Sequence, residues 1–499
     1  MQIAFITPEV LPYSKTGGLA DVALALPAVL ADAGAGVTVF SPLHRQAKER
    51  LGAAQLNLEE LKLPFELWIG RDSQPVEFLV APDITPRQVF IVNDHYFDRP
   101  HPYLDDDGQD YPDNVARYAY FCRAVLEYCR QQKLRPDVFH CNDWQSALVP
   151  AYLKHGDYAA DFTTARSVLT IHNLGYQGLF PSAEIYATGL DWDVFTPDHF
   201  EFYDNLNLLK GGISFADALT TVSPTYAREI QTEEFGHGLH GVLTNHGSKL
   251  TGIVNGIDPR VWNPRVDMHL PAGYHSGAMS GKKTCRRLLQ SEMGLPVRSS
   301  CLLLGVISRL DRQKGIDLVS AAFRELAALD LQLVVLGSGD AELQAQLELL
   351  AADFPDQVAV RIGYDEPLAH RIIAGSDAFL MPSRYEPCGL TQLYSQAYGT
   401  VPIVRSTGGL ADTVTDYTPR RLGSGRASGF AFPDPDAAQL AAALRRAAKL
   451  YFTDHKAWNK LMKLIMRLDR SWQNSAAEYL AVYDKLAQAV PAAPEVSHV

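Results

Sequence analysis

Short apolar runs alternate with longer amphipathic stretches along most of the chain. In the first half, strand-like runs at 3–7, 37–40, 138–141 and 167–172 alternate with helical patterns at 19–33, 114–132 and 146–155. In the second half, strand-like runs at 302–307, 331–336, 358–362 and 378–380 alternate with helical patterns at 318–329, 342–353, 366–374 and 390–398. This alternation is typical of parallel sheets wrapped by helices. It predicts an α/β protein with two doubly wound, Rossmann-like domains that face a deep cleft.

Three interruptions of this pattern set the expected boundaries. Strand-like runs separated by turn residues predict an antiparallel insertion over about 51–93, and the stretch 98–113, rich in Asp, Pro, Gly and Tyr, predicts a loop. A proline-containing stretch that begins near 250–258 marks a seam. We therefore expect an N-terminal domain over 1–250 and a C-terminal domain over 251–470. The segment 471–499 is expected to form a helix that crosses back to the N-terminal domain, followed by a short tail.

Composition and charge narrow the classes of protein. The 499 residues carry a formal net charge of −12, which disfavours a nucleic-acid or anionic-membrane partner. The six cysteines are dispersed and lack the spacing of a zinc site, so reduced thiols and no metal or other cofactor are expected. No leader pattern and no apolar run of about 18 residues is found, which predicts a cytoplasmic protein.

The hexapeptide Thr-Gly-Gly-Leu-Ala-Asp occurs twice, at 16–21 and at 407–412, each time after an apolar run. The free N–H groups of a first helical turn and the helix dipole favour an anion, and glycine lets the backbone approach it closely. Two such turns facing each other would hold a diphosphate. A glycine pair taken alone is more often an ordinary helix start or tight turn than a ligand site.

Two further loops carry charged groups at predicted strand ends. Arg309 and Lys314 lie between the strand-like run 302–307 and the next helix, where a doubly wound domain binds its ligand. One cation 4 Å from a phosphate contributes roughly 4 kcal/mol of Coulomb energy at an effective dielectric near 20, before desolvation. Glu386 follows another strand, where it suits sugar hydroxyls as an acceptor. The alternatives are solvated loop cations and a carboxylate that only caps a helix.

Polar residues also end two strands of the first half. Asp143 and Trp144 follow one strand, and His172 and Asn173 end the next. If the two strands are neighbours, these side chains converge on one rim, and the indole suits a sugar ring. A single strand-end histidine is more often a hydrogen-bonded structural group. Tyr364, at another strand end, is either a neighbour of a nucleobase or an ordinary rim tyrosine.

Taken together, seven segments resemble the bacterial glycogen synthase and plant starch synthase family, in the expected order along nearly the whole chain. They are Lys15-Thr-Gly-Gly-Leu-Ala-Asp21, His140-Cys-Asn-Asp-Trp144, His172-Asn173, Val254-Asn-Gly-Ile-Asp258, Ser308-Arg-Leu-Asp-Arg-Gln-Lys-Gly315, Glu386-Pro-Cys-Gly-Leu-Thr-Gln392 and Thr407-Gly-Gly-Leu-Ala-Asp412. The resemblance implies a GT-B fold and retaining transfer of glucose. ADP-glucose is the implied donor, and the non-reducing end of an α-1,4-glucan such as glycogen is the implied acceptor.

The resemblance also implies roles for matching residues. Arg309 and Lys314 correspond to the clamp on the departing diphosphate, Glu386 to the contact with glucose hydroxyls, and His172 to the histidine beside the reacting sugar; these are the expected catalytic residues. The remaining expected substrate contacts are Lys15, Gly17, Gly18, Asp21, Asp143, Trp144, Asn173, Tyr364, Cys388, Gly389, Leu390 and Thr391. Many related glycosyltransferases carry a second glutamate eight positions after the first. Tyr394 stands there in this chain, as generally in glycogen and starch synthases, so no carboxylate pair is expected.

Three other functions fit parts of the pattern. A glycoside hydrolase acts on glucan but needs two carboxylates and no phosphate clamp. A transferase that uses UDP-glucose, or a small acceptor such as sucrose phosphate, needs nearly the same architecture. A non-catalytic glucan-binding protein would bind polysaccharide without releasing a nucleotide. The sequence leaves open the preference for ADP or UDP, the acceptor length, the oligomeric state and any regulation.

Overall fold

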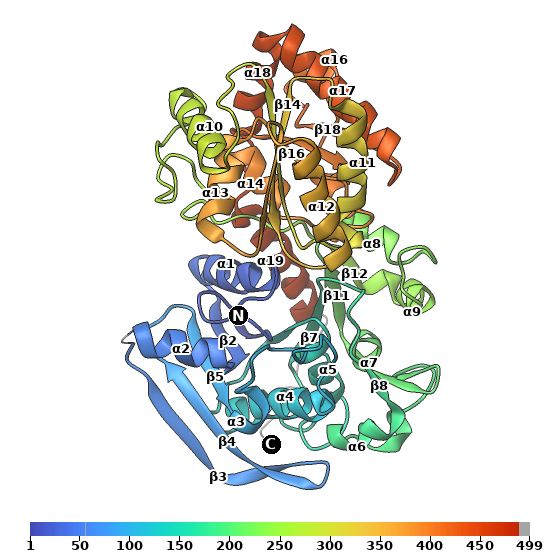
Figure 1. The fold of residues 1–499 in the computed structure, drawn as a ribbon. Coiled ribbons are helices and arrows are strands. Elements are labelled where there is room, and N and C mark those ends of the chain that lie inside the picture. Colours follow the sequence, from blue (N-terminus) through green and yellow to red (C-terminus); the bar gives the residue numbers. More distant parts are fainter. Residues whose placement is uncertain (55, 489–499) are drawn as a thin grey trace. The chain divides into compact units, whose positions relative to one another are not determined.

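The chain divides into two compact units in the computed structural model, which describes residues 1–54 and 56–488 (Figure 1). Of the described residues, the first unit comprises Met1–Val222, Ala227–Ile253 and 472–488, and the tail expected after the last helix lies outside the described residues. The second unit comprises Ser223–Tyr226 and Val254–Ser471. The chain therefore passes between the units four times, twice around the short segment Ser223–Tyr226 and twice around Val254–Ser471.

The first unit is built on a nine-stranded sheet in the order β12-β11-β7-β6-β1-β2-β5-β4-β3. The strands are β1 (Gln2–Ile6), β2 (Gly36–Pro42), β3 (Glu59–Ile69), β4 (Asp72–Ala81), β5 (Arg87–Val92), β6 (Val138–Asn142), β7 (Arg166–Ile171), β11 (Ala218–Thr221) and β12 (Leu250–Gly252). Strands β3 and β4 form an antiparallel hairpin, whereas β5 pairs antiparallel with β4 and parallel with β2. The hairpin therefore extends the parallel sheet at one edge.

Helices pack around this sheet, and a small second sheet adjoins it. The helices assigned to this part of the chain are α1 (Leu19–Asp32), α2 (Arg45–Ala54), α3 (Asp94–Phe97), α4 (Asn114–Gln131), α5 (Leu148–Tyr152), α6 (Ile185–Thr188), α7 (Leu208–Phe215), α8 (Pro224–Glu229), α9 (His240–Asn245) and α19 (Trp472–Gln488). The small sheet consists of β8 (Leu179–Pro181), β9 (Glu201–Phe202) and β10 (Asn205–Asn207). Residues 98–113 form the predicted loop.

Helix α19 completes the core of the first unit. Its side chains Trp472, Ala476, Tyr479 and Tyr483 are buried against residues of α1, β1 and β2. The hydroxyl of Tyr483 forms a hydrogen bond of 2.7 Å with Nδ1 of His140, which lies on β6. The last helix of the chain thus packs with its first strands.

The second unit is a six-stranded parallel sheet in the order β15-β14-β13-β16-β17-β18. The strands are β13 (Leu302–Ile307), β14 (Leu331–Gly337), β15 (Val358–Ile362), β16 (Ala378–Met381), β17 (Val401–Arg405) and β18 (Phe430–Phe432). The helices are α10 (Ser280–Glu292), α11 (Ile316–Leu326), α12 (Ala341–Asp353), α13 (Glu366–Gly375), α14 (Thr391–Ala397), α15 (Gly408–Thr413), α16 (Pro419–Gly423), α17 (Ala437–Thr453) and α18 (His455–Ile465). Strands β13 and β14 are buried along nearly their whole length, as expected for a parallel sheet covered on both faces.

Each sheet contains a point at which the strand order reverses. In the first unit, the chain moves from β1 to β2 on one side and from β6 to β7 on the other. In the second unit, it moves from β13 to β14 on one side and from β16 to β17 on the other. Ligands of doubly wound sheets bind outside the carboxyl ends of the strands at such a point. The two reversals therefore select the loops after β1, β6, β13 and β16.

No helix within the described ranges has both the length and the apolar character needed to cross a bilayer.

Candidate active site

The loop after β1 contains a buried carboxylate that sequence reasoning missed. Glu9, 2% exposed, accepts hydrogen bonds from the backbone N–H and the hydroxyl of Thr16, both at 2.6 Å, and from the N–H of Gly17 at 3.3 Å. Burial raises the pKa of Glu9, and these hydrogen bonds oppose the rise. The amide of Gly17 therefore already has an acceptor. The predicted contact of Gly17 with substrate stays a prediction.

The other predicted residues of this turn lie at the start of α1. Lys15 Nζ forms an ion pair of 3.0 Å with Asp21 Oδ2, and both side chains are largely covered. Gly18 immediately precedes the first residue of the helix. Lys15 is thus held over the first turn of α1 by a carboxylate of that same turn.

Asp143, His172 and Asn173 converge at the ends of the neighbouring strands β6 and β7, as predicted. Asp143 Oδ1 accepts the backbone N–H of His172 at 2.7 Å. Burial raises the pKa of Asp143 to about 7, although hydrogen bonds from the N–H groups of His172 and Asn173 oppose the rise. Asp143 also has a φ of 54°, an uncommon conformation outside glycine that fixes the direction of its side chain.

The imidazole of His172 is a neutral hydrogen-bonding group. Burial lowers its pKa to about 3. Its Nε2 lies 2.9 Å from Oδ1 of Asn142, whose Nδ2 in turn donates to the carbonyl of Ile6 at 3.0 Å. Because this second bond orients the amide, Nε2 of His172 donates and Nδ1 keeps its lone pair. The side chain can therefore accept a hydrogen bond from a hydroxyl at Nδ1.

Trp144 contributes more to packing than to an open rim. The ring is 5% exposed, and it contacts the rings of Tyr118 and Phe180 at centroid distances of 4.9 and 5.7 Å. A Cβ on Gly178 would lie 2.6 Å from this ring. The indole therefore does not present an open face to a sugar, and only the small exposed part of the side chain could contact one. Asn173 accepts the N–H of Gly175 at 3.0 Å and is half-buried.

In the second unit, an ion pair joins the two loops at the reversal point. Lys314 Nζ lies 2.9 Å from Oε1 and 2.7 Å from Oε2 of Glu386, and the two side chains are 20% and 7% exposed. The hydroxyl of Ser383 donates to the same carboxylate at 2.9 Å. Sequence reasoning selected Lys314 and Glu386 separately. The structure brings them together, because β13 and β16 are adjacent strands.

Arg309 lies on the same loop as Lys314, with a side chain that is 53% exposed and 3.2 Å from Asp311. Asp311 also accepts the N–H of Lys314 at 2.9 Å, which fixes the turn. Gly315 has a φ of +68°, and a Cβ there would lie 2.2 Å from the carbonyl oxygen of Pro382. This glycine lets the loop after β13 contact the loop after β16.

The second glycine pair packs against the loop of Glu386. A Cβ on Gly408 would lie 2.0 Å from the carbonyl oxygen of Glu386, and the N–H of Gly409 donates to the carbonyls of Glu386 and Pro387 at 3.2 and 3.1 Å. The prediction that both glycine turns present their amides to a diphosphate is therefore wrong for Gly409. Gly409 instead makes an ordinary packing contact with the loop of Glu386.

The turn that begins α14 remains available. Among the described residues, no hydrogen bond from the N–H groups of Leu390 and Thr391 is found, and both residues are half-buried. Gly389 has a φ of +69°, which turns the chain into the helix. Burial raises the pKa of the Cys388 thiol to about 12, so this thiol is protonated and is no nucleophile at neutral pH.

The comparisons with known proteins decide the family. The chain is 48% identical over 492 residues to the glycogen synthase of Anaeromyxobacter dehalogenans (strain 2CP-C), covering 98% of this chain and 100% of that protein. It is 42% identical to the glycogen synthase of Thermotoga maritima, with 97% and 99% covered. The chain belongs to the glycogen and starch synthase family. The family models agree: the starch synthase catalytic domain matches residues 2–245, and glycosyl transferases group 1 match residues 298–462.

Solved structures agree with this family and with the fold to different degrees. The catalytic domain of starch synthase IV from Arabidopsis thaliana, bound to ADP and acarbose, superposes with a TM-score of 0.88 at 34% identity, covering 97% of this chain and 99% of that one. Sucrose-phosphate synthase from Thermosynechococcus elongatus superposes with a TM-score of 0.60 at 18% identity, which shows a shared fold alone. The protein is a glycosyltransferase with the GT-B fold, as its sequence predicts.

Two further points concern the predicted ligands. Tyr364 follows β15 and is 77% exposed, and its hydroxyl lies 3.3 Å from Glu366 Oε2. Its contact with a nucleobase stays a prediction. Within the described ranges, no group of three or more His, Cys, Asp or Glu side chains is arranged to hold a metal ion.

Proposed function

We propose that this glycosyltransferase transfers glucose, with retention of configuration, from ADP-glucose to the non-reducing end of an α-1,4-glucan and so elongates glycogen. The observation that carries the proposal is the pairing of Lys314 with Glu386 at the strand reversal of the second unit. It is supported by full-length similarity to proteins named glycogen synthase and by the starch synthase IV structure that holds ADP.

The cations act on the leaving group. As the bond between glucose and phosphate breaks, positive charge grows on the sugar and negative charge grows on ADP. Lys314 and Arg309 lie on the loop after β13, and the amides of Leu390 and Thr391 lie at the start of α14, which follows the adjacent strand β16. We assign all of these groups to stabilising the departing diphosphate. Groups fixed in place before the reaction stabilise the transition state more than the ground state.

Glu386 binds the substrate and does not act as a nucleophile. Its two oxygens accept hydrogen bonds from Lys314 and Ser383, which orient the carboxylate for contacts with sugar hydroxyls. Tyr394, eight positions later, stacks on Trp262 with a centroid distance of 3.6 Å and provides no second carboxylate. We therefore assign a front-face displacement, in which an oxygen of the leaving phosphate takes the acceptor proton.

The first unit supplies groups for the sugars. Neutral His172 accepts a glucose hydroxyl at Nδ1 and steadies the sugar without removing a proton. Asp143 and Asn173 lie beside it as hydrogen-bonding partners. Lys15, Gly18 and Asp21 remain contacts for the donor phosphates and the acceptor, the exposed part of Trp144 remains a sugar contact, and Tyr364 remains the neighbour of the base.

The test is an assay with glycogen primer and either ADP-glucose or UDP-glucose. Nucleotide release and polymer growth are followed together, and proton NMR of the new linkages reports the anomeric configuration. We expect one ADP for each glucose added, with α linkages and much slower reaction with UDP-glucose. Growth with UDP-glucose alone, β linkages, or release of free sugar without a nucleotide sugar would each contradict the proposal.

A further inference from the structure

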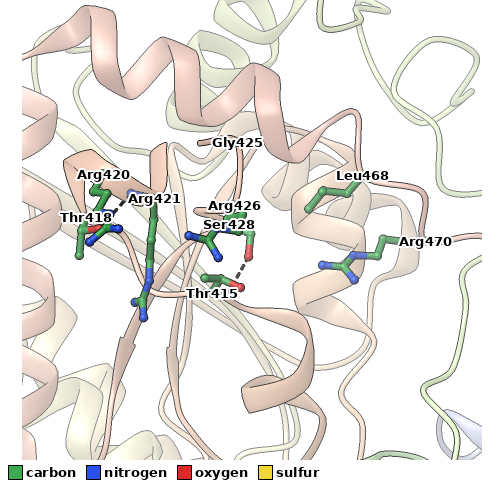
Figure 2. Close-up of a pocket in the computed structure, with 9 residues that line it drawn as sticks. All are labelled: Thr415, Thr418, Arg420, Arg421, Gly425, Arg426, Ser428, Leu468 and Arg470. Carbon is green, nitrogen blue, oxygen red and sulfur yellow. Dashed lines mark hydrogen bonds between the residues drawn. The ribbon is translucent and has the colours of Figure 1, made fainter. Parts of the chain in front are cut away.

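The second unit contains a cavity of about 800 Å³ outside the candidate active site (Figure 2). It lies beyond the C-terminal end of α15, and α16 forms part of its wall. Nine residues line it: Thr415, Thr418, Arg420, Arg421, Gly425, Arg426, Ser428, Leu468 and Arg470. Figure 2 shows Arg420 and Arg421 on one side of the view and Arg470 on the other, with Arg426 between them.

The lining includes four arginines and no carboxylate, in a chain of net charge −12. Arg421 donates to the backbone carbonyl of Asp416 at 3.2 Å, and Arg426 donates to the hydroxyl of Ser424 at 3.3 Å. The carboxylate of Asp416 itself is engaged by Arg446 at 2.7 Å. In the described part of the chain, no carboxylate lies within ion-pair distance of the four lining arginines.

Four guanidinium groups around one cavity give it a positive local potential, which favours an anion between them. Planar guanidinium groups bind phosphate through paired N–H donors, and the charge makes these hydrogen bonds stronger than neutral ones. Exposed Thr415 and half-buried Thr418 add hydroxyls, and Leu468 adds an apolar wall. The volume falls within the range of small-molecule sites. We propose that this cavity binds a small organic phosphate that carries at least two anionic groups.

Arg470 ties the cavity to the rest of the unit. It donates to the carbonyl of Thr413, at the end of α15, at 2.8 Å and to Oε1 of Gln396 in α14 at 3.0 Å. Its own carbonyl accepts the N–H of Ile257 at 2.8 Å, close in sequence to two of the four positions where the chain passes between units. Arg470 therefore links α14 and α15 to the segment around Ile257, and a phosphate bound in the cavity would contact this same arginine.

The test uses the full chain carrying Arg309→Gln and Lys314→Gln, which removes the cations proposed to bind the donor diphosphate. Inorganic pyrophosphate and glucose 1,6-bisphosphate are titrated by calorimetry, so that binding of any phosphate is distinguished from a requirement for the sugar. Arg420→Gln and Arg426→Gln are then added together. The matched control adds Arg324→Gln and Arg445→Gln, which remove the same charge from exposed ion pairs of the same unit.

We expect the bisphosphate to bind, with an affinity about 10-fold weaker for each lining arginine removed and nearly unchanged in the control. Arg420→Gln alone supplies a second measurement in a folded protein, because this side chain is exposed to solvent. Absence of binding, equal loss in the control, or undiminished binding in both lining variants would overturn the proposal. Binding is read without glucose transfer, so this result is independent of the proposed function.

Discussion

Replacing Lys314 by glutamine separates two roles that this side chain plays at once. The ammonium neutralises Glu386, and it is proposed to stabilise the leaving diphosphate. With the charges about 3 Å apart and both side chains mostly buried, the pair contributes roughly 5 kcal/mol of Coulomb energy at an effective dielectric near 20, before desolvation. Removing one partner of such a pair leaves an uncompensated buried charge, and we expect a loss of about 3 kcal/mol in the free energy of unfolding.

Lys314→Gln is also expected to lower kcat, for a different physical reason, and the double variant separates this effect from the loss of stability. Loss of one preorganised charge at the leaving group lowers kcat by about 100- to 1000-fold. Glu386→Gln combined with Lys314→Gln removes the unpaired carboxylate. The double variant is therefore expected to regain much of the stability lost in Lys314→Gln while its kcat stays low.

The measurements are urea unfolding and initial rates with ADP-glucose and glycogen, for both single variants and the double variant. Lys154→Gln is the matched control, because Lys154 pairs with Asp217 at the same 2.7 Å in the first unit, away from the candidate site. It should lower the stability slightly and leave kcat unchanged. Recovery of kcat in the double variant would show that Lys314 acts only by neutralising Glu386 and would refute the assigned role.

Three further predictions follow from the sites described above. The pKa of Asp143 is raised from an ordinary 3.8 to about 7 in the fold; its contribution to stability is therefore present at low pH and lost as pH rises through 7, and Asp143→Asn should remove that slope from unfolding measured between about pH 4 and 8. His172→Gln should lower kcat about 10- to 100-fold by a ratio that stays constant from pH 5.5 to 8, because the imidazole is neutral throughout; a ratio that changes near pH 6.5 would indicate a titrating base. Gly408→Ala should lower both stability and kcat because its Cβ would strike the carbonyl of Glu386, whereas Gly423→Ala meets open space and should change neither, as thermal unfolding and rates will show.

Most strands of the two larger sheets could be predicted, because they are apolar runs bounded by turn residues, whereas the short strands β11, β12 and β18 were not predicted. Strands β13 and β14 are continuous apolar runs that lie in the middle of a covered sheet. Helix α2 was missed, since only Ala47 and Leu51 of its residues are buried and the helical period is weak. The pairing of β5 was also out of reach, because the same six residues pair with a parallel neighbour and an antiparallel one.

The candidate site was predictable where it depends on strand ends and not where it depends on distant partners. Lys314 and Glu386 follow strands, and the reversal of strand order brings them together. The amide of Gly17, in contrast, donates to Glu9 in the preceding loop. No sequence motif around Glu9 indicates this contact. The burial of Trp144 depends on Gly178, which follows β7. The sequence next to Trp144 gives no sign that this distant glycine packs on the indole.

The position of α19 has a consequence for how the protein is made. Tyr479 and Tyr483 fill the core beside β1 and β6. During translation, β1 and β6 are therefore synthesised long before the helix that covers them. The second unit ends at Ser471 and has all of its residues available first. The first unit, although translated earliest, is therefore the last to complete its core. Until synthesis ends, its uncovered apolar surface is exposed to binding by chaperones.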